Sequence, residues 1–192
     1  YIPHFMSWVV AASIFSMILS PTSAGLVNDI LMKLHLISDN IYFLGDQKWW
    51  RFSYYLINVW KDTGWGTIIF MATLAGISPE LYEAASMDGA NRFQKMIYIT
   101  LPALNNTIVT VLVLNLAKVM NLFESVFVLQ NDAVIKVSDV LQTYIYTQTF
   151  NSGAIPDYGY TTAVGMFSSI ISCILVLVCN RVSHKTRGRG IV

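Results

Sequence analysis

Charged residues are scarce in this sequence. They make up only 12% of its 192 residues, whereas hydrophobic residues make up 55%, and the mean hydropathy is +0.54. A soluble domain carries roughly 25% charged residues, so this composition excludes an ordinary soluble fold. The formal net charge is +1, and no nucleic-acid partner is expected.

The sequence also lacks the residues that an enzyme or a metal site would need. Its cysteines, Cys173 and Cys179, both fall in one apolar stretch, where a small apolar role is expected. The histidines, His4, His35 and His184, are scattered at the ends of segments. No nucleophile stands with a base, and no ligands cluster. We therefore predict no catalytic residues, no metal and no cofactor.

Long apolar runs are what the sequence does contain. Four stretches are near the roughly 20 residues that about 30 Å of hydrocarbon requires. They are His4 to Ser20, Tyr54 to Ile77, Ala103 to Phe127 and Thr161 to Asn180. Helices satisfy their own backbone hydrogen bonds in lipid. The sequence therefore predicts an all-α integral membrane protein, a polytopic bundle with about four spans in this chain.

The basic residues indicate the orientation of these spans. They are dense in the short loop 78–102 and in the C-terminal tail, where they are Arg92, Lys95, Arg181, Lys185, Arg187 and Arg189. Such density favours a cytoplasmic side, so loops 21–53 and 129–160 are expected to face outward and the C-terminus to be cytoplasmic. The first span begins almost at residue 1 without a basic flank or signal peptide. We therefore expect upstream spans that are missing from this chain.

Aromatic residues interleave with polar ones just before the second span, in the stretch IYFLGDQKWWRFSYY, residues 41–55. This pattern predicts an aromatic belt at the membrane interface. The alternative is a surface on which a partner docks from outside.

The loop 78–102 begins with the signals of a helix start. Ser78 is a capping hydroxyl, Pro79 suits the first helical position, and Glu80 lies at the positive end of the helix dipole. A short helix is predicted from Pro79 to about Asp88, with Gly89 ending it.

The same loop is predicted to fold as a helix-turn-helix with a flat face. Leu81, Ala84, Ala85 and Asp88 share that face, and Glu83 is a charged anchor at its rim. A second helix is expected from Asn91 to Tyr98. We expect Pro102 to end it and to redirect the chain into the next span.

The residues of this loop carry a family resemblance. Their pattern is Glu-Ala-Ala, three residues, Gly, nine residues, Ile, one residue and Leu-Pro, at Glu83, Ala84, Ala85, Gly89, Ile99, Leu101 and Pro102. It resembles the EAA loop of permease subunits of bacterial ABC importers. The stretches HFMSWVV, LFESVFVL and YTTAVGMFSS extend the resemblance to the LplB-like carbohydrate branch of the binding-protein-dependent transport system inner membrane component family.

The resemblance implies an ABC type I importer permease that moves a carbohydrate, most simply an oligosaccharide, across the bacterial plasma membrane. The helix from Pro79 to Asp88 would be the coupling helix, which docks in a groove of a cytoplasmic ATPase subunit. Further implied partners are a second permease subunit, giving a heterodimer, and an extracytoplasmic solute-binding protein. No GxxxxGK[ST] phosphate-binding loop occurs in the chain, so energy from ATP has to arrive through a partner.

Polar residues inside the spans are candidates for a substrate path. Amides and aromatic rings suit a sugar, and the candidates are Asn58, Trp60, Trp65, Asn115, Lys118 and Asn121. Asn115, Lys118 and Asn121 are predicted to form one stripe, continued by Glu124. The alternative for this stripe is a structural contact between helices. For Lys61 and Asp62 the alternative is an interfacial pair with Lys61 snorkelling outward.

Three other functions stay open at this stage. The sequence lacks the catalytic residues that a membrane-embedded enzyme would need. A passive channel would leave the loop 78–102 unexplained. An importer for a non-sugar solute is the nearest alternative, because the coupling loop reports the energy supply and not the cargo.

Overall fold

The computed structural model describes residues 1–22, 24–151 and 157–187, with side chains described as far as Arg181. Lys185, Arg187 and Arg189, used above to orient the tail, therefore lie outside the described side chains. The described residues form helices and no strands. The elements are η1 (Ile2–Phe5), α1 (Trp8–Ile18), α2 (Leu26–Lys33), α3 (Gln47–Ala75), α4 (Pro79–Met87), α5 (Arg92–Lys95), η2 (Met96–Thr100), α6 (Leu101–Val119), α7 (Glu124–Leu129), α8 (Ile135–Ser138), α9 (Leu141–Phe150) and α10 (Tyr158–Arg187).

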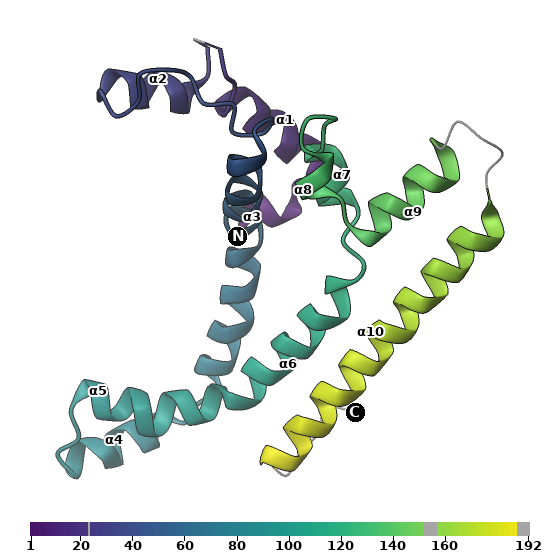
Figure 1. Ribbon diagram of the computed structural model, residues 1–192. Coiled ribbons are helices and arrows are strands. Elements are labelled where there is room, and N and C mark those ends of the chain that lie inside the picture. Colours follow the sequence, from purple (N-terminus) through teal and green to yellow (C-terminus); the bar gives the residue numbers. More distant parts are fainter. Residues whose placement is uncertain (23, 152–156, 188–192) are drawn as a thin grey trace.

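Long helices connect two groups of short ones (Figure 1). The helices α4 and α5 form a hairpin at one end of the molecule, and α1, α2, α7 and α8 gather at the other. The helix α6 packs against both α3 and α10. The helix α9 lies beside the start of α10, where the Tyr144 and Tyr160 hydroxyls are 3.3 Å apart. The hydrogen bond with Tyr160 raises the pKa of Tyr144, because it stabilises the protonated phenol.

Two continuous helical segments of the described chain are long and apolar enough to cross a membrane, Arg92–Val119 and Tyr158–Arg181. The first expected span is shorter than predicted, because α1 has 11 residues and so reaches only about 16 Å. The second falls mostly within α3, which has 29 residues and ends at Ala75, and it carries Lys61 and Asp62 near the middle of that helix. The hydropathy pattern alone predicts four spans, whereas two helical segments of the described chain are both long enough and apolar enough to cross a membrane.

The third expected span differs at both ends. Its helix stops at Val119 instead of continuing to Phe127, and a turn at Met120 and Asn121 separates it from α7. At the other end the helix does not start afresh after Pro102. Helical backbone runs without interruption from Arg92 through η2 into α6.

The buried apolar core lies at the end of the molecule that holds α1 and α7 (Figure 1). Trp50 and Tyr54, from the predicted aromatic belt, belong to this core. The Trp50 indole donates a hydrogen bond to the Leu129 carbonyl at 3.0 Å, and the Tyr54 hydroxyl lies 2.9 Å from the Ser125 hydroxyl. Part of the belt prediction was therefore wrong, since these two rings pin α3 to α7. Trp49, Phe52 and Tyr55 are exposed, as a belt requires.

Asn28 holds the connection between α1 and α3 together. Its side chain is 0% exposed. Its amide nitrogen donates to the carbonyls of Ser20 (2.8 Å) and Ile41 (2.9 Å), and its amide oxygen accepts from the Ile41 N–H at 2.9 Å. One side chain thus satisfies three partly buried backbone groups that have no helix of their own to pair with.

Replacing Asn28 by alanine should destabilise the protein by about 1–3 kcal/mol, because three partly buried polar groups would lose their partner. We expect a fall of several degrees in the Tm of the detergent-purified protein. Lys33→Ala is the control, since Lys33 pairs with Asp29 on the exposed face of the same helix and such pairs contribute little. An unchanged Tm for Asn28→Ala would mean that water replaces the amide.

Candidate functional site

The helix α4 begins and ends close to the predicted positions. Ser78 is the N-cap residue, Pro79 occupies the first turn, and Glu80 is the acidic residue there. However, the Ser78 side chain makes no capping hydrogen bond. The capping hydroxyl predicted from the sequence is therefore wrong, and the fixed φ of Pro79 and the charge of Glu80 are what favour this helix start.

Gly89 ends α4 in the way its position predicts. Its φ is +77°, in the left-handed region that favours glycine. The Gly89 N–H donates to the Ser86 carbonyl at 3.1 Å, and the Ala90 N–H donates to the Ala85 carbonyl at 2.9 Å. These two bonds form a Schellman motif, which satisfies the last carbonyls of α4 and reverses the chain.

The chain re-enters helix at Asn91, whose side chain forms a capping box with Gln94. The predicted break at Pro102 is absent, and the physical reason lies one turn earlier. Residues Met96–Thr100 form a π-helical turn, in which the Leu101 N–H bonds to the Met96 carbonyl. The wider turn changes the backbone register before a proline that lacks an N–H, so the helix continues into α6.

The outer face of α4 is uncovered. None of its residues is buried; Leu81 is 53% exposed and Met87 is 90% exposed. Beside this face is a depression of about 430 Å³, lined by Ile77, Pro79, Tyr82, Glu83, Ser86 and Lys95. An exposed helix face that carries apolar side chains and a carboxylate is able to bind a complementary protein surface.

Sequence reasoning missed the side chains that tie α4 to the following helix. The Tyr82 hydroxyl lies 2.9 Å from the Thr100 hydroxyl, and the Lys95 ammonium donates to the Ser86 hydroxyl. The sequence gives no signal for these pairs, because only the reversal at Gly89 brings their partners together.

The residues of the EAA pattern therefore occupy distinct places in one compact unit. Glu83, Ala84 and Ala85 lie on α4, while Asp88 is its C-cap and Gly89 turns the chain. Ile99 lies in the π turn, and Leu101 and Pro102 begin α6.

The candidate path residues of α3 are largely engaged with the N-terminal segment. The Trp60 ring meets Phe15 edge to face with centroids 5.1 Å apart, and Trp65 stacks on His4 at 4.7 Å. Asn58 donates to the Tyr54 carbonyl of its own helix at 2.8 Å. These contacts agree with structural roles.

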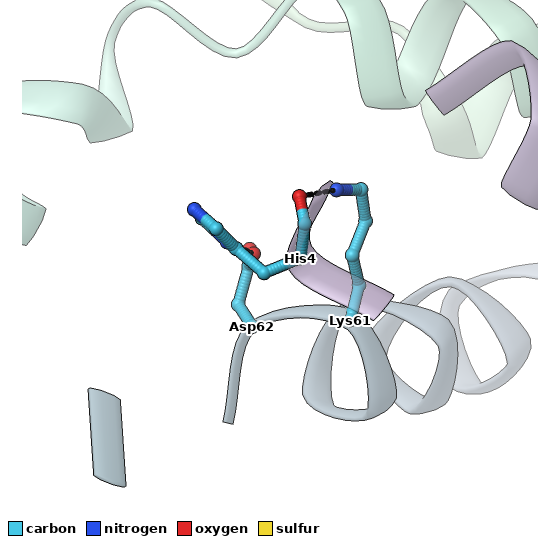
Figure 2. Close-up of polar contacts among 3 residues, drawn as sticks. All are labelled: His4, Lys61 and Asp62. Atoms are coloured by element: carbon cyan, nitrogen blue, oxygen red, sulfur yellow. Dashed lines mark hydrogen bonds and ion pairs between the residues drawn. The ribbon is translucent and has the colours of Figure 1, made fainter. Parts of the chain in front are cut away.

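Lys61 and Asp62 do not form the expected interfacial pair, and both meet His4 instead (Figure 2). The Lys61 ammonium donates to the His4 carbonyl at 3.0 Å and lies 5.2 Å from the centre of the Trp8 ring. The Asp62 carboxylate is 3.1 Å from His4 Nδ1. Lys61 is only 5% exposed, so it does not snorkel outward, because a carbonyl and an aromatic face stabilise its charge in place.

The stripe predicted along α6 is only partly formed. Asn115 and Lys118 lie on the helix and are exposed, one turn apart. Asn121 lies in the turn beyond it, where its amide bonds to the Ala117 carbonyl at 3.2 Å and Gln142 donates to it at 3.4 Å. Glu124 begins a separate helix, α7, so the continuous stripe was wrong.

A hollow of about 480 Å³ does lie between α3 and α6, but its lining differs from the predicted residues. The Thr73 and Thr107 hydroxyls are 2.8 Å apart there. The remaining lining is mostly apolar and consists of Ile68, Ile69, Ala72, Thr110, Val111 and Leu114. The predicted candidates from the two helices are thus not brought together in this hollow.

Comparison with known families decides what kind of membrane protein carries this loop. The family described as binding-protein-dependent transport system inner membrane component matches residues 1–188. The chain belongs to this family. Members of this family are inner membrane components of ABC transporters, and the described residues of this chain form helices without strands.

Two relatives from Bacillus subtilis (strain 168) match the permease along its whole length. It is 40% identical to Protein LplB and 40% identical to the polygalacturonan/rhamnogalacturonan transport system permease protein YteP. In both cases the match covers 100% of this chain and 58% of the relative. The chain thus spans less than two thirds of the length of these curated relatives.

Solved structures agree with the sequence comparison. The permease superimposes with a TM-score of 0.90, at 36% identity, on a bacterial ABC transporter involved in the import of the acidic polysaccharide alginate. It gives a TM-score of 0.91, at 35% identity, with a bacterial alginate ABC transporter in complex with an alginate pentasaccharide-bound periplasmic protein. These matches cover 97% and 100% of this chain, and 64% and 65% of the respective structures.

Substitution of Gly89 tests whether the left-handed turn holds the loop together. Gly89→Ala should cost about 1–2 kcal/mol, because φ is unfavourable for an L-residue, although nothing lies within 4 Å of the added Cβ. We expect amide exchange of Ala90, which bonds to Ala85, to accelerate about 5–30-fold.

Gly66→Ala is the matched control for this experiment. An added Cβ at Gly66 also meets nothing within 4 Å, but Gly66 lies inside the regular helix α3. Alanine favours helix there, so amide exchange of Ala90 should not accelerate. Equal behaviour of the two variants would contradict a special role for the turn.

Proposed function

We propose that this chain is part of the transmembrane subunit of an ATP-driven ABC importer that moves an oligosaccharide across the bacterial plasma membrane. The observation that carries the proposal is the 40% identity, over the whole chain, to the permease of a polygalacturonan/rhamnogalacturonan transport system. A 32% identity to the arabinooligosaccharides transport system permease protein AraP of Bacillus subtilis points to the same class of cargo.

Residues 1–192 form, in this proposal, a single permease domain whose loop 78–102 is cytoplasmic. Arg92 and Lys95 in that loop, and Arg181 at the far end of α10, supply the basic charge expected on the cytoplasmic side. The opposite group of helices would then face outward, and the C-terminus would be cytoplasmic.

The helix α4 would be the coupling helix that docks on an ATPase subunit, which hydrolyses the ATP. Its exposed face and its two adjacent alanines support close docking. The residues assigned to coupling are Glu83, Ala84, Ala85, Asp88, Gly89, Ile99, Leu101 and Pro102. The first four offer contacts, while the others fix the reversal and the helix that follows.

A second permease subunit would cover part of the spans. Only 6% of the apolar window of either candidate span is buried within the chain, so both leave apolar side chains for lipid or for other helices. We propose a heterodimer, to which an extracytoplasmic solute-binding protein delivers the carbohydrate. One of the structural neighbours, the alginate transporter, is in complex with a periplasmic protein that holds an alginate pentasaccharide.

Substrate contact is assigned first to the polar residues at the outer end of α6. Asn115 and Lys118 are exposed, and Asn121 follows in the adjoining turn. Asn58, Trp60 and Trp65 stay secondary candidates, because their described contacts are with η1, α1 or their own helix.

Charge reversal on the coupling helix should abolish ATPase binding. The full-length permease is co-expressed with its ATPase for this test. We expect Glu83→Lys to reduce copurification of the ATPase at least about tenfold, because the lysine would repel a basic group of the ATPase that complements Glu83 at the rim of the interface. Copurification and solute-stimulated ATP hydrolysis are the measurements.

Asp132→Lys is the matched control, since it makes the same charge change in an exposed loop at the other end of the molecule. It should leave ATPase association unchanged. If the ATPase binds wild type and Glu83→Lys equally well, α4 is not the docking element. If it never binds wild type, the importer assignment fails, and a channel is the remaining alternative.

Alanine substitutions on α6 test the path. Asn115→Ala and Lys118→Ala should each reduce uptake of a labelled oligosaccharide about threefold to tenfold, because a hydrogen-bonding group would be lost from the pathway. Asn121→Ala is expected to have a smaller effect, since its amide is already engaged with Ala117. Leu112→Ala, at an exposed apolar position of the same helix, serves as control. Normal uptake in all three polar variants would remove them from the path.

A further inference from the structure

Four side chains link α4 to the helix that enters the bilayer. Tyr82 and Ser86 lie one turn apart on α4, while Lys95 and Thr100 lie at the two ends of the π turn η2. Tyr82 pairs with Thr100 through their hydroxyls at 2.9 Å, and the Lys95 ammonium donates to the Ser86 hydroxyl. Two hydrogen bonds, which we call rungs, thus join α4 to the helix that continues into α6.

Further hydrogen bonds close these rungs into a ring. The Ser86 hydroxyl donates to the Tyr82 carbonyl at 2.7 Å, and the Thr100 hydroxyl donates to the Lys95 carbonyl at 3.4 Å. Each member therefore contacts two others, and Tyr82 has its hydroxyl proton free to donate to Thr100. Such a network fixes one relative placement of two helices more firmly than an isolated bond does.

The attachment of α4 depends strongly on this ring. No residue of α4 is buried, so apolar packing within the chain contributes little to its position. Apart from the ring, the short connections through Gly76 to Ser78 and through Gly89 to Asn91 hold it. Beyond the ring, unbroken helix leads from Arg92 to Val119.

We propose that Tyr82, Ser86, Lys95 and Thr100 form a transmission clamp, which converts displacement of α4 into displacement of α6. This inference rests on the proposed function, and it adds a role separate from docking. The four are positioning residues: they hold α4 against the base of the span and do not themselves make the ATPase contact. Cutting the clamp should leave ATP hydrolysis running while less solute is moved per ATP.

The test uses the complete importer reconstituted in liposomes, with its ATPase, partner permease and binding protein. Solute uptake and ATP hydrolysis are measured in the same vesicles, and their ratio is the readout. Tyr82→Phe and Thr100→Val each remove one hydroxyl with little change in shape. Each should lower the ratio about threefold or more, because Tyr82→Phe loses the bond to Thr100, and Thr100→Val loses that bond and the one to the Lys95 carbonyl. ATPase association should stay within about twofold of wild type.

Two comparisons separate the clamp from general damage. Thr100→Ser keeps the hydroxyl and should keep the wild-type ratio, whereas Thr100→Val should not. The double variant with Tyr82→Phe and Thr100→Val should be no worse than Thr100→Val alone, because Tyr82→Phe removes only a bond that Thr100→Val already removes. On the other rung, Lys95→Met should lower the ratio.

Different outcomes would overturn the clamp and the proposed importer function on which it rests. Wild-type ratios in Tyr82→Phe, Thr100→Val and Lys95→Met, or equal ratios in Thr100→Ser and Thr100→Val, would overturn the clamp while the importer assignment stands. Loss of ATPase association in these variants would make the ring part of docking, and would also overturn it. Failure of the wild-type chain to bind any ATPase would overturn the proposed function itself.

Discussion

Continuity of the backbone hydrogen bonds from Arg92 to Val119 is the constraint on which the rest of this structure depends. A chain that enters lipid cannot leave carbonyls or N–H groups unpaired, yet this chain carries Pro102 close to the entry point. The π turn from Met96 to Thr100 resolves the conflict. As a result, the second part of the loop, from Arg92 onward, and the span form one continuous helix instead of two hinged pieces. A clamp at Thr100 and Lys95 can transmit a displacement of α4 to α6 only because the helix beyond it is unbroken.

The two ends of the molecule are stabilised in different ways. One end has a conventional core, in which Trp50 and Tyr54 tie α3 to α7 and Asn28 closes the connection before α3. The other end consists of an exposed helix fixed by a turn and a ring of hydrogen bonds. The chain thus concentrates its own packing at one end of the molecule. It leaves most of the surface of its two candidate spans unburied.

Local signals predicted the bounds of α4, whereas long-range contacts corrected the interpretation of the polar residues. Pro79, Glu80 and Gly89 act on the residues next to them, so the bounds of α4 followed from the sequence. Lys61 shows the opposite case. Its ammonium meets the carbonyl of His4, which is 57 positions away in the sequence, and this partner is what makes a buried lysine tolerable. The stripe along α6 failed for a similar reason, because the helix ends at Val119 where the chain turns back toward α9.

The sequence by itself determined the membrane class, the helical fold and the position of the loop, because these depend on composition and on the spacing of nearby residues. Tertiary structure alone decided how α4 is held. Tyr82 meets Thr100, and Ser86 meets Lys95, only after Gly89 reverses the chain. It also decided that aromatic residues of one short stretch divide between a buried core and an exposed surface. Hydropathy records how apolar a side chain is, whereas its neighbours in space determine whether it packs, binds or faces lipid.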